Sequence, residues 1–253
     1  MLGFLSAPMG VAYHLLSMLA ILLGPLPAGL ATAAAIVLFT AAVRLLLSPL
    51  SFAALRGQAG IAALQPRVAA LRARYASQPD RLQRELAALY QAQGGTLLSG
   101  CLPLLIQLPF FSALYRLFRS QTVAGQPNAL LAKNLLGAPL GSHWLTGAGL
   151  LSAHGLVFLG LFALLAVACF AVARISRAVS RPAEAAPGAT GTGPRLAGVL
   201  GRVLPYLTVI VAAFVPLAAG LYLLTTTSWT AAERAIWRWL AHRPGQGAPA
   251  SAG

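Results

Sequence analysis

The residue of this sequence best placed to do chemistry is a single arginine inside an apolar segment. Arg44 lies within residues 28–50, a run that carries no other charge and is long enough to cross a bilayer. A centrally placed arginine costs roughly 2.5–3.5 kcal/mol to insert, and such residues usually face a bundle interior or a water-filled cavity. Thr40 and Ser48 lie four residues to either side of Arg44, on the same helix face. The three residues predict a polar stripe near the cytoplasmic side.

Two interpretations of Arg44 stay open. The guanidinium either lines a functional cavity or extends along its own helix to the inner membrane interface. Ser51 follows Arg44 by a helical distance on the order of 10 Å, which is near the limit of an arginine side chain. We favour the cavity and expect it to be open and hydrated, because the glutamates (Glu85, Glu184 and Glu233) are expected outside the hydrocarbon.

Further polar groups occur in two other apolar segments. Gln107 lies in the middle of a Leu/Ile-rich run, where it either contributes to a site or forms a hydrogen bond that holds two helices together. A hydroxyl cluster extends from Thr225 to Ser228. Such hydroxyls can bind the backbone of their own helix, so we expect a structural role for this cluster.

Conventional catalytic and cofactor sites are not indicated. Lys133 is the only lysine and does not belong to a phosphate-binding Gly-x-x-x-x-Gly-Lys-Ser/Thr motif. Asp80 is the only aspartate, so neither paired carboxylates nor a Ser/His/Asp set is available. The four histidines are scattered, and Cys101 and Cys169 lie in apolar stretches. We therefore expect a protein that is not an enzyme and that has no metal or cofactor.

The composition indicates a membrane protein with several spans. Among 253 residues, 58% are hydrophobic and 9% are charged, whereas an ordinary soluble domain has roughly 25% charged residues. The net charge of +14 is then a signal of topology, because Lys and Arg collect on the cytoplasmic side. We expect an all-α polytopic fold with five transmembrane helices, a cytoplasmic amphipathic hairpin and an N-terminal interfacial helix.

The predicted organisation follows from the apolar runs and their breaks. Residues 1–27 contain a short apolar helix and a Gly/Pro breaker; we expect the helix to lie at the outer surface, with a retained signal anchor as the alternative. The expected spans are residues 28–50, 96–118, 150–173, 196–215 and 217–239. They are joined by the hairpin of residues 51–95, an extracytoplasmic loop at 119–149 and a cytoplasmic loop at 174–195, and a cytoplasmic tail covers residues 240–253.

The distribution of arginine predicts the orientation. The hairpin, the 174–195 loop and the C-terminal end together hold thirteen arginines, whereas the other side holds Arg116, Arg119 and Lys133. The excess places the N-terminus outside and the C-terminus in the cytoplasm.

Two matched apolar stripes characterise residues 51–95. Both repeat at helical spacing on either side of the turn at Ser77–Pro79, and we expect them to face each other or the lipid surface. A plain connector would not need such stripes. The stripe residues are Ile61, Leu64, Val68 and Leu71 in the first arm and Leu82, Leu86 and Leu89 in the second.

Several segments resemble the YidC family of membrane-protein insertases, in its short bacterial form without the large extracytoplasmic domain. They are Arg44-Leu-Leu-Leu-Ser-Pro49, Leu64-Gln-Pro-Arg67, the block from Gly100 to Tyr115 with Pro103, Gln107 and Pro109, and Phe214-Val-Pro216 followed by Gly220-Leu-Tyr222. The resemblance runs in order from about residue 4 to residue 240.

The resemblance implies an insertase and folding chaperone of the bacterial plasma membrane that uses no nucleotide. A hydrophilic inner-leaflet groove would hold the polar part of a nascent membrane protein while its apolar helix moves into lipid. Arg44 and Gln107 match the groove arginine and glutamine of the family, and Tyr222 and Trp229 are further groove candidates. The hairpin would receive the incoming chain.

The partners that this implies are nascent membrane proteins and the lipid bilayer. The Sec translocon and the ribosome stay open as partners, and no specific nucleic acid is expected. Two alternatives remain at the level of sequence: a small-solute transporter or channel, which needs a polar path across both leaflets, and a structural assembly factor, for which Arg44 would be dispensable.

Overall fold

The computed structural model describes residues 6–92, 112, 115–120, 122–123, 126–146, 149, 152–184 and 206–241. Most of these residues are helical. Two helical segments, Ala28–Gly57 and Ala153–Ser176, are long and apolar enough to cross a membrane. The predicted all-α membrane architecture is thus supported. The second predicted span falls largely outside the described residues, as does the first half of the fourth, so the number of five spans stays a prediction.

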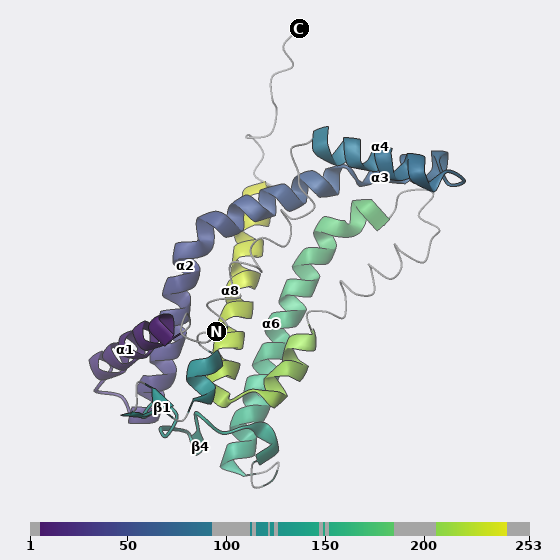
Figure 1. Ribbon diagram of the computed structural model, residues 1–253. Coiled ribbons are helices and arrows are strands. Elements are labelled where there is room, and N and C mark those ends of the chain that lie inside the picture. Colours follow the sequence, from purple (N-terminus) through teal and green to yellow (C-terminus); the bar gives the residue numbers. More distant parts are fainter. Residues whose placement is uncertain are drawn as a thin grey trace.

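Helix α2 (Ala28–Ala63) connects the expected first span to the hairpin without interruption. It begins directly after the Gly/Pro breaker, where the backbone N–H of Ala31 donates to Pro27 O at 2.9 Å. Pro49 lies inside the helix and cannot donate to the preceding turn. The helix changes direction along its length (Figure 1), as expected for a proline-containing helix.

Three long helices form the bundle. Helix α8 (Leu217–Ala241) packs against both α2 and α6 (Ala153–Glu184), while α1 (Ser6–Leu22) lies across α2 (Figure 1). The fully buried side chains of the core include Leu16, Ile36, Leu117, Phe118, Phe158, Leu165 and Leu217. Large apolar side chains also remain exposed on the outside of the bundle, among them Leu46, Val167 and Phe214. Such an apolar exterior suits contact with lipid.

The hairpin consists of α3 (Gln65–Arg74) and α4 (Pro79–Ala92), which lie side by side at the end of α2 (Figure 1). The turn between them contains Tyr75, whose ring is contacted by the guanidinium groups of Arg74 and Arg81 at 5.7 and 5.9 Å. Helix α6 continues through Glu184, so the chain remains helical beyond residue 173, where the predicted span ends.

Within the predicted extracytoplasmic loop of residues 119–149, short strands and a 3-10 turn form a folded cap. Strand β1 (Thr122–Val123) pairs with β2 (Gln126–Pro127), and β3 (Asn134–Leu135) pairs with β4 (Ala138–Pro139), both antiparallel; η3 (Trp144–Thr146) follows. Leu136 and Gly137 form the second turn with φ of 51° and 92°, as a tight two-residue hairpin turn requires. These strands have two residues each, and the described part of the fold is otherwise mostly helical.

The cap supplies hydrogen-bond acceptors to the first turn of α8. The N–H groups of Leu217 and Ala218 donate to Ser142 O and Leu140 O at 3.0 and 2.9 Å. The first N–H groups of a helix have no partners within it, so these two bonds fix where α8 begins.

Asn128 joins the cap to the end of the helix at residues 115–119. Its side chain is 6% exposed, and Nδ2 donates to Leu117 O and Ser120 O at 2.8 and 3.0 Å. Oδ1 accepts from the N–H of Leu130 at 3.3 Å. One side chain thus satisfies three backbone groups.

Replacing Asn128 by alanine should lower the free energy of unfolding by about 2–3 kcal/mol, because buried backbone groups would lose their partners. Thermal unfolding of the purified protein in detergent measures the change. Asn134→Ala is the matched control, since Asn134 is exposed in β3. Equal unfolding temperatures for the two variants would contradict the role assigned to Asn128.

Candidate functional site

Arg44 contacts α8 through one nitrogen of its guanidinium. Nη2 donates to Thr226 O at 2.9 Å and to the hydroxyl of Thr230 at 2.5 Å. Nε is buried and has no hydrogen-bond partner in the described part of the chain. The side chain is half-buried, whereas the adjacent Leu45 and Leu46 are exposed. Arg44 therefore binds a neighbouring helix and does not extend alone along α2 toward the membrane interface.

The hydroxyls of α8 separate into two groups. Those of Thr225, Thr227 and Thr230 donate to the carbonyl four residues earlier, at 2.8–2.9 Å, which confirms the expected structural role for this kind of residue. Thr226 differs, because its hydroxyl is buried without a partner among the described residues. The contact between Arg44 and α8 thus contains two polar groups without a hydrogen-bond partner among the described residues, the Thr226 hydroxyl and Arg44 Nε.

A carboxylate lies next to this contact, near the end of α8. Glu233 is 6% exposed, and its Oε1 accepts from the hydroxyl of Ser48 and from Nε1 of Trp229, each at 2.9 Å. The Ser48 hydroxyl also lies 3.0 Å from Arg44 O, so its one proton is shared between the two acceptors.

The expectation that no acid accompanies Arg44 is wrong. Glu233 is expected outside the hydrocarbon, but the packing of α8 against α2 buries it beside Ser48, one turn from Arg44. A signal was available in the sequence. Thr226, Thr230 and Glu233 follow one another at spacings of four and three residues, which places them on one helix face.

The structure brings together only some of the predicted groove residues. Ser48 and Trp229 meet at Glu233, one turn beyond Arg44. The Thr40 hydroxyl donates to Ile36 O at 2.7 Å within α2 and is buried. Tyr222 is 4% exposed and belongs to the main core. Gln107 lies outside the described residues, so its place at this site stays a prediction.

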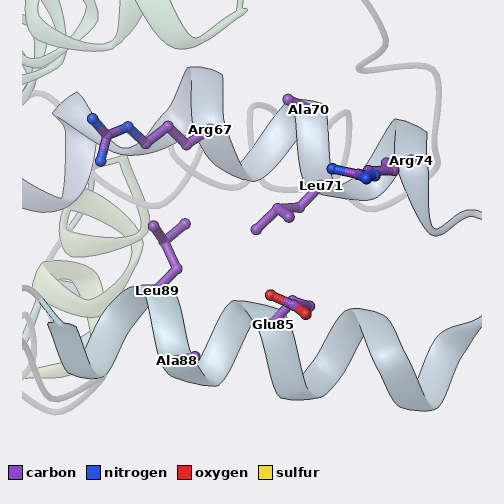
Figure 2. Close-up of a pocket in the computed structure, with 7 residues that line it drawn as sticks. All are labelled: Arg67, Ala70, Leu71, Arg74, Glu85, Ala88 and Leu89. Atoms are coloured by element: carbon purple, nitrogen blue, oxygen red, sulfur yellow. The ribbon is translucent and has the colours of Figure 1, made fainter.

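A second candidate site lies between the two arms of the hairpin. An open groove of about 430 Å³ is lined by residues of α3 and α4, and in Figure 2 the side chains of Leu71 and Leu89 point toward each other across it. Arg67, Arg74 and Glu85 form its polar rim. Of the predicted stripe residues, Leu64 and Val68 are buried and Leu82 and Leu86 are half-buried; the side chain of Ile61 is not among those described.

The chemistry of both sites is binding by charge, hydrogen bonding and apolar contact. Within the described residues no group of three or more His, Cys, Asp or Glu side chains could hold a metal ion. The arginine contact offers a cationic donor, hydroxyls and a carboxylate between two long helices, and the hairpin offers an apolar groove with a charged rim. A bundle of apolar-faced helices with a polar contact inside is typical of a membrane protein.

A comparison with protein families shows to which family this membrane protein belongs. The chain matches the model of the 60Kd inner membrane protein family over residues 27–242, and it therefore belongs to this family. The match includes Arg44, the hairpin and Glu233, and it confirms the resemblance that the sequence motifs indicated.

Curated relatives support the same assignment over shorter regions. The membrane protein insertase YidC of Clostridium perfringens is 41% identical over 87 residues, which cover 34% of this chain and 37% of that protein. The insertases YidC of Granulibacter bethesdensis and Chloroherpeton thalassium are 40% identical over 82 residues and 35% identical over 100 residues. These two alignments cover 32% and 40% of this chain but only 14% and 17% of the relatives.

Proposed function

We propose that this protein is a membrane protein insertase and folding chaperone of the bacterial plasma membrane. The observation that carries the proposal is Arg44, a half-buried guanidinium between two apolar helices whose Nε has no partner in the described part of the chain. The family assignment and the insertase relatives support it.

In the proposed mechanism, the chain crosses the membrane five times with the N-terminus outside and the C-terminus in the cytoplasm. The side of α2 and α8 that carries Arg44, Ser48 and Trp229 lines a hydrophilic inner-leaflet groove together with Gln107. This groove transiently holds the polar part of a nascent membrane protein. Meanwhile the apolar helix of the substrate partitions into lipid, which releases free energy as apolar surface leaves water. Neither nucleotide hydrolysis nor a cofactor is needed.

Charge explains why an arginine suits this task. A guanidinium attracts the acidic residues of a translocated tail, and the attraction is stronger where water is scarce. Its fixed fork of donors can also bind backbone carbonyls, as it does with Thr226 O. The substrate would replace part of these internal contacts with its own polar groups.

The hairpin would receive the incoming chain from the cytoplasm. Its groove presents Leu71 and Leu89 to an apolar segment while the charged rim faces water. An apolar helix held there would be shielded before it reaches the bilayer.

Replacing Leu71 by aspartate should reduce insertion about tenfold, because a charge in the groove disfavours an apolar ligand by more than 1 kcal/mol. Ala73→Asp is the matched control: it adds the same charge to an exposed position of α3 that does not line the groove. Insertion of a single-span substrate into proteoliposomes measures both variants. Equal activities would contradict a receiving role for the groove.

Reconstitution tests the proposed function itself. Proteoliposomes that contain only the purified protein should insert a short single-span membrane protein without ATP or GTP, as shown by protection of its translocated tail from protease. Empty liposomes set the background. The proposal would be contradicted if none of several single-span substrates were inserted above this background. Flux of small solutes instead would favour a transporter.

A further inference from the structure

The buried carboxylate of Glu233 has a role that the insertion mechanism does not require. It lies at the contact between α2 and α8, where Arg44 alone would suffice to bind an acidic tail. Burying a carboxylate is costly unless hydrogen bonds and nearby positive charge compensate for lost hydration. We therefore expect the Glu233 carboxylate to affect which substrate tails bind at Arg44.

Glu233 lies near two arginines, but the hydrogen bonds that its Oε1 accepts come from other groups. Two neutral donors, the Ser48 hydroxyl and Trp229 Nε1, bind Oε1. Both Arg44 and Arg234 are close enough to interact electrostatically with the carboxylate. Each arginine nevertheless takes hydroxyl or carbonyl partners: Arg44 binds Thr226 and Thr230, and Arg234 binds the hydroxyl of Ser176.

The two arginines face different neighbours. Arg44 extends from α2 to α8, whereas Arg234 on α8 reaches α6 through Ser176. At the contact between α2 and α8, Arg44 and Glu233 therefore lie about one helical turn apart along α2, since Ser48 follows Arg44 by four residues. A second arginine of α2, Arg56, lies further along the helix over the ring of Trp237.

We propose that Glu233 is a specificity-determining residue that limits how much acidic charge the Arg44 site accepts. This inference rests on the proposed insertase function. One carboxylate of a substrate can pair with Arg44, but each further acidic group meets the negative charge of Glu233 in a site of low polarity. The preferred substrates are membrane proteins whose translocated tails are neutral or weakly acidic. Strongly acidic tails are disfavoured.

Glu233→Gln provides an almost isosteric test. Glutamine Oε1 can still accept from Ser48 and Trp229, so the variant removes the charge and keeps the two hydrogen bonds. The assay is insertion into proteoliposomes of one single-span substrate whose tail carries from none to several acidic residues. The variant should insert the most acidic tail about fivefold better relative to the uncharged tail than the wild type does, equivalent to about 1 kcal/mol.

Asp80→Asn is the matched control, because it removes a carboxylate from an exposed position at the start of α4. It should leave the dependence on tail charge as in the wild type. An unchanged tail-charge dependence in Glu233→Gln would overturn the inference, as would a uniform loss for all tails, which would assign Glu233 a structural role.

The wild-type protein supplies an independent measurement should the variant fail to accumulate. Its insertion efficiency should be highest for weakly acidic tails and fall as more acidic residues are added. A continuous rise with acidic charge would overturn the inference while leaving the insertase function intact. Failure of the wild type to insert any tail would instead reject the proposed function.

Discussion

Replacement of Arg44 by alanine should reduce the insertion of a substrate with a weakly acidic tail by about tenfold or more. The variant loses the guanidinium that α2 directs at Thr226 and Thr230 of α8, and with it both hydrogen bonds from Nη2. A charge-assisted hydrogen bond in a partly dry site is worth about 1.5–3 kcal/mol, which corresponds to at least a tenfold effect. Insertion into proteoliposomes measures the loss, with an uncharged tail as the comparison.

The stability of this variant should separate a binding role from a structural one. Burying arginine in a membrane span costs roughly 2.5–3.5 kcal/mol, so alanine should leave the thermal unfolding temperature unchanged or raise it. Loss of insertion by a protein that is as stable as the wild type would place the defect in the site. Normal insertion of every substrate by Arg44→Ala would contradict the role of the charge.

Arg44→Lys is the conservative partner of this experiment. Lysine keeps the positive charge and should largely preserve insertion, because attraction of acidic tails needs charge more than shape. Failure of the lysine variant alone would show that the planar guanidinium, which here binds a carbonyl and a hydroxyl through one nitrogen, is required.

Replacement of Gly29 by alanine should destabilise the protein by about 3 kcal/mol or more. Gly29 lies in the first turn of α2, where an added Cβ would be 1.6 Å from Asn134 O and 2.3 Å from its carbonyl carbon. These are backbone atoms of β3, so the cap would have to move as a unit. The thermal unfolding temperature should fall by roughly 10 °C at about 2–4 °C per kcal/mol.

Gly160→Ala is the matched control for this prediction. Gly160 lies in α6, and an added Cβ there would meet no atom within 4 Å. Alanine is also the better helix former, so this variant should be as stable as the wild type or slightly more so. If Gly29→Ala unfolds at the same temperature as Gly160→Ala, the cap does not pack as closely on α2 as the structure shows.

Periodicity and composition predict where helices occur, but not where each one ends. The apolar run from Ala28 and the two stripes around Pro79 are helical, yet α2 continues to Ala63, beyond the expected span of residues 28–50. The polar stripe on α2 was also predictable, because residues four apart share a helix face. These features depend on local spacing, which a sequence contains in full.

Features that depend on contacts between distant segments were not predicted. Glu233 is separated from Ser48 by 185 residues, and only the packing of α8 on α2 brings them together. The strands of the cap have two residues each, which is too short for an alternating pattern. In the second hairpin the only local sign was Gly137, which adopts the positive φ that its turn requires.

The central claim is that a nascent membrane protein passes the contact between Arg44 and α8. A photo-crosslinker at position 226, where the native hydroxyl is buried without a partner among the described residues, tests this most directly. Position 167 is the control, because Val167 is 66% exposed on the outer face of α6. A stalled single-span substrate should form adducts at position 226 and far fewer at position 167. An absence of adducts at position 226, while the same protein inserts the substrate, would contradict the account.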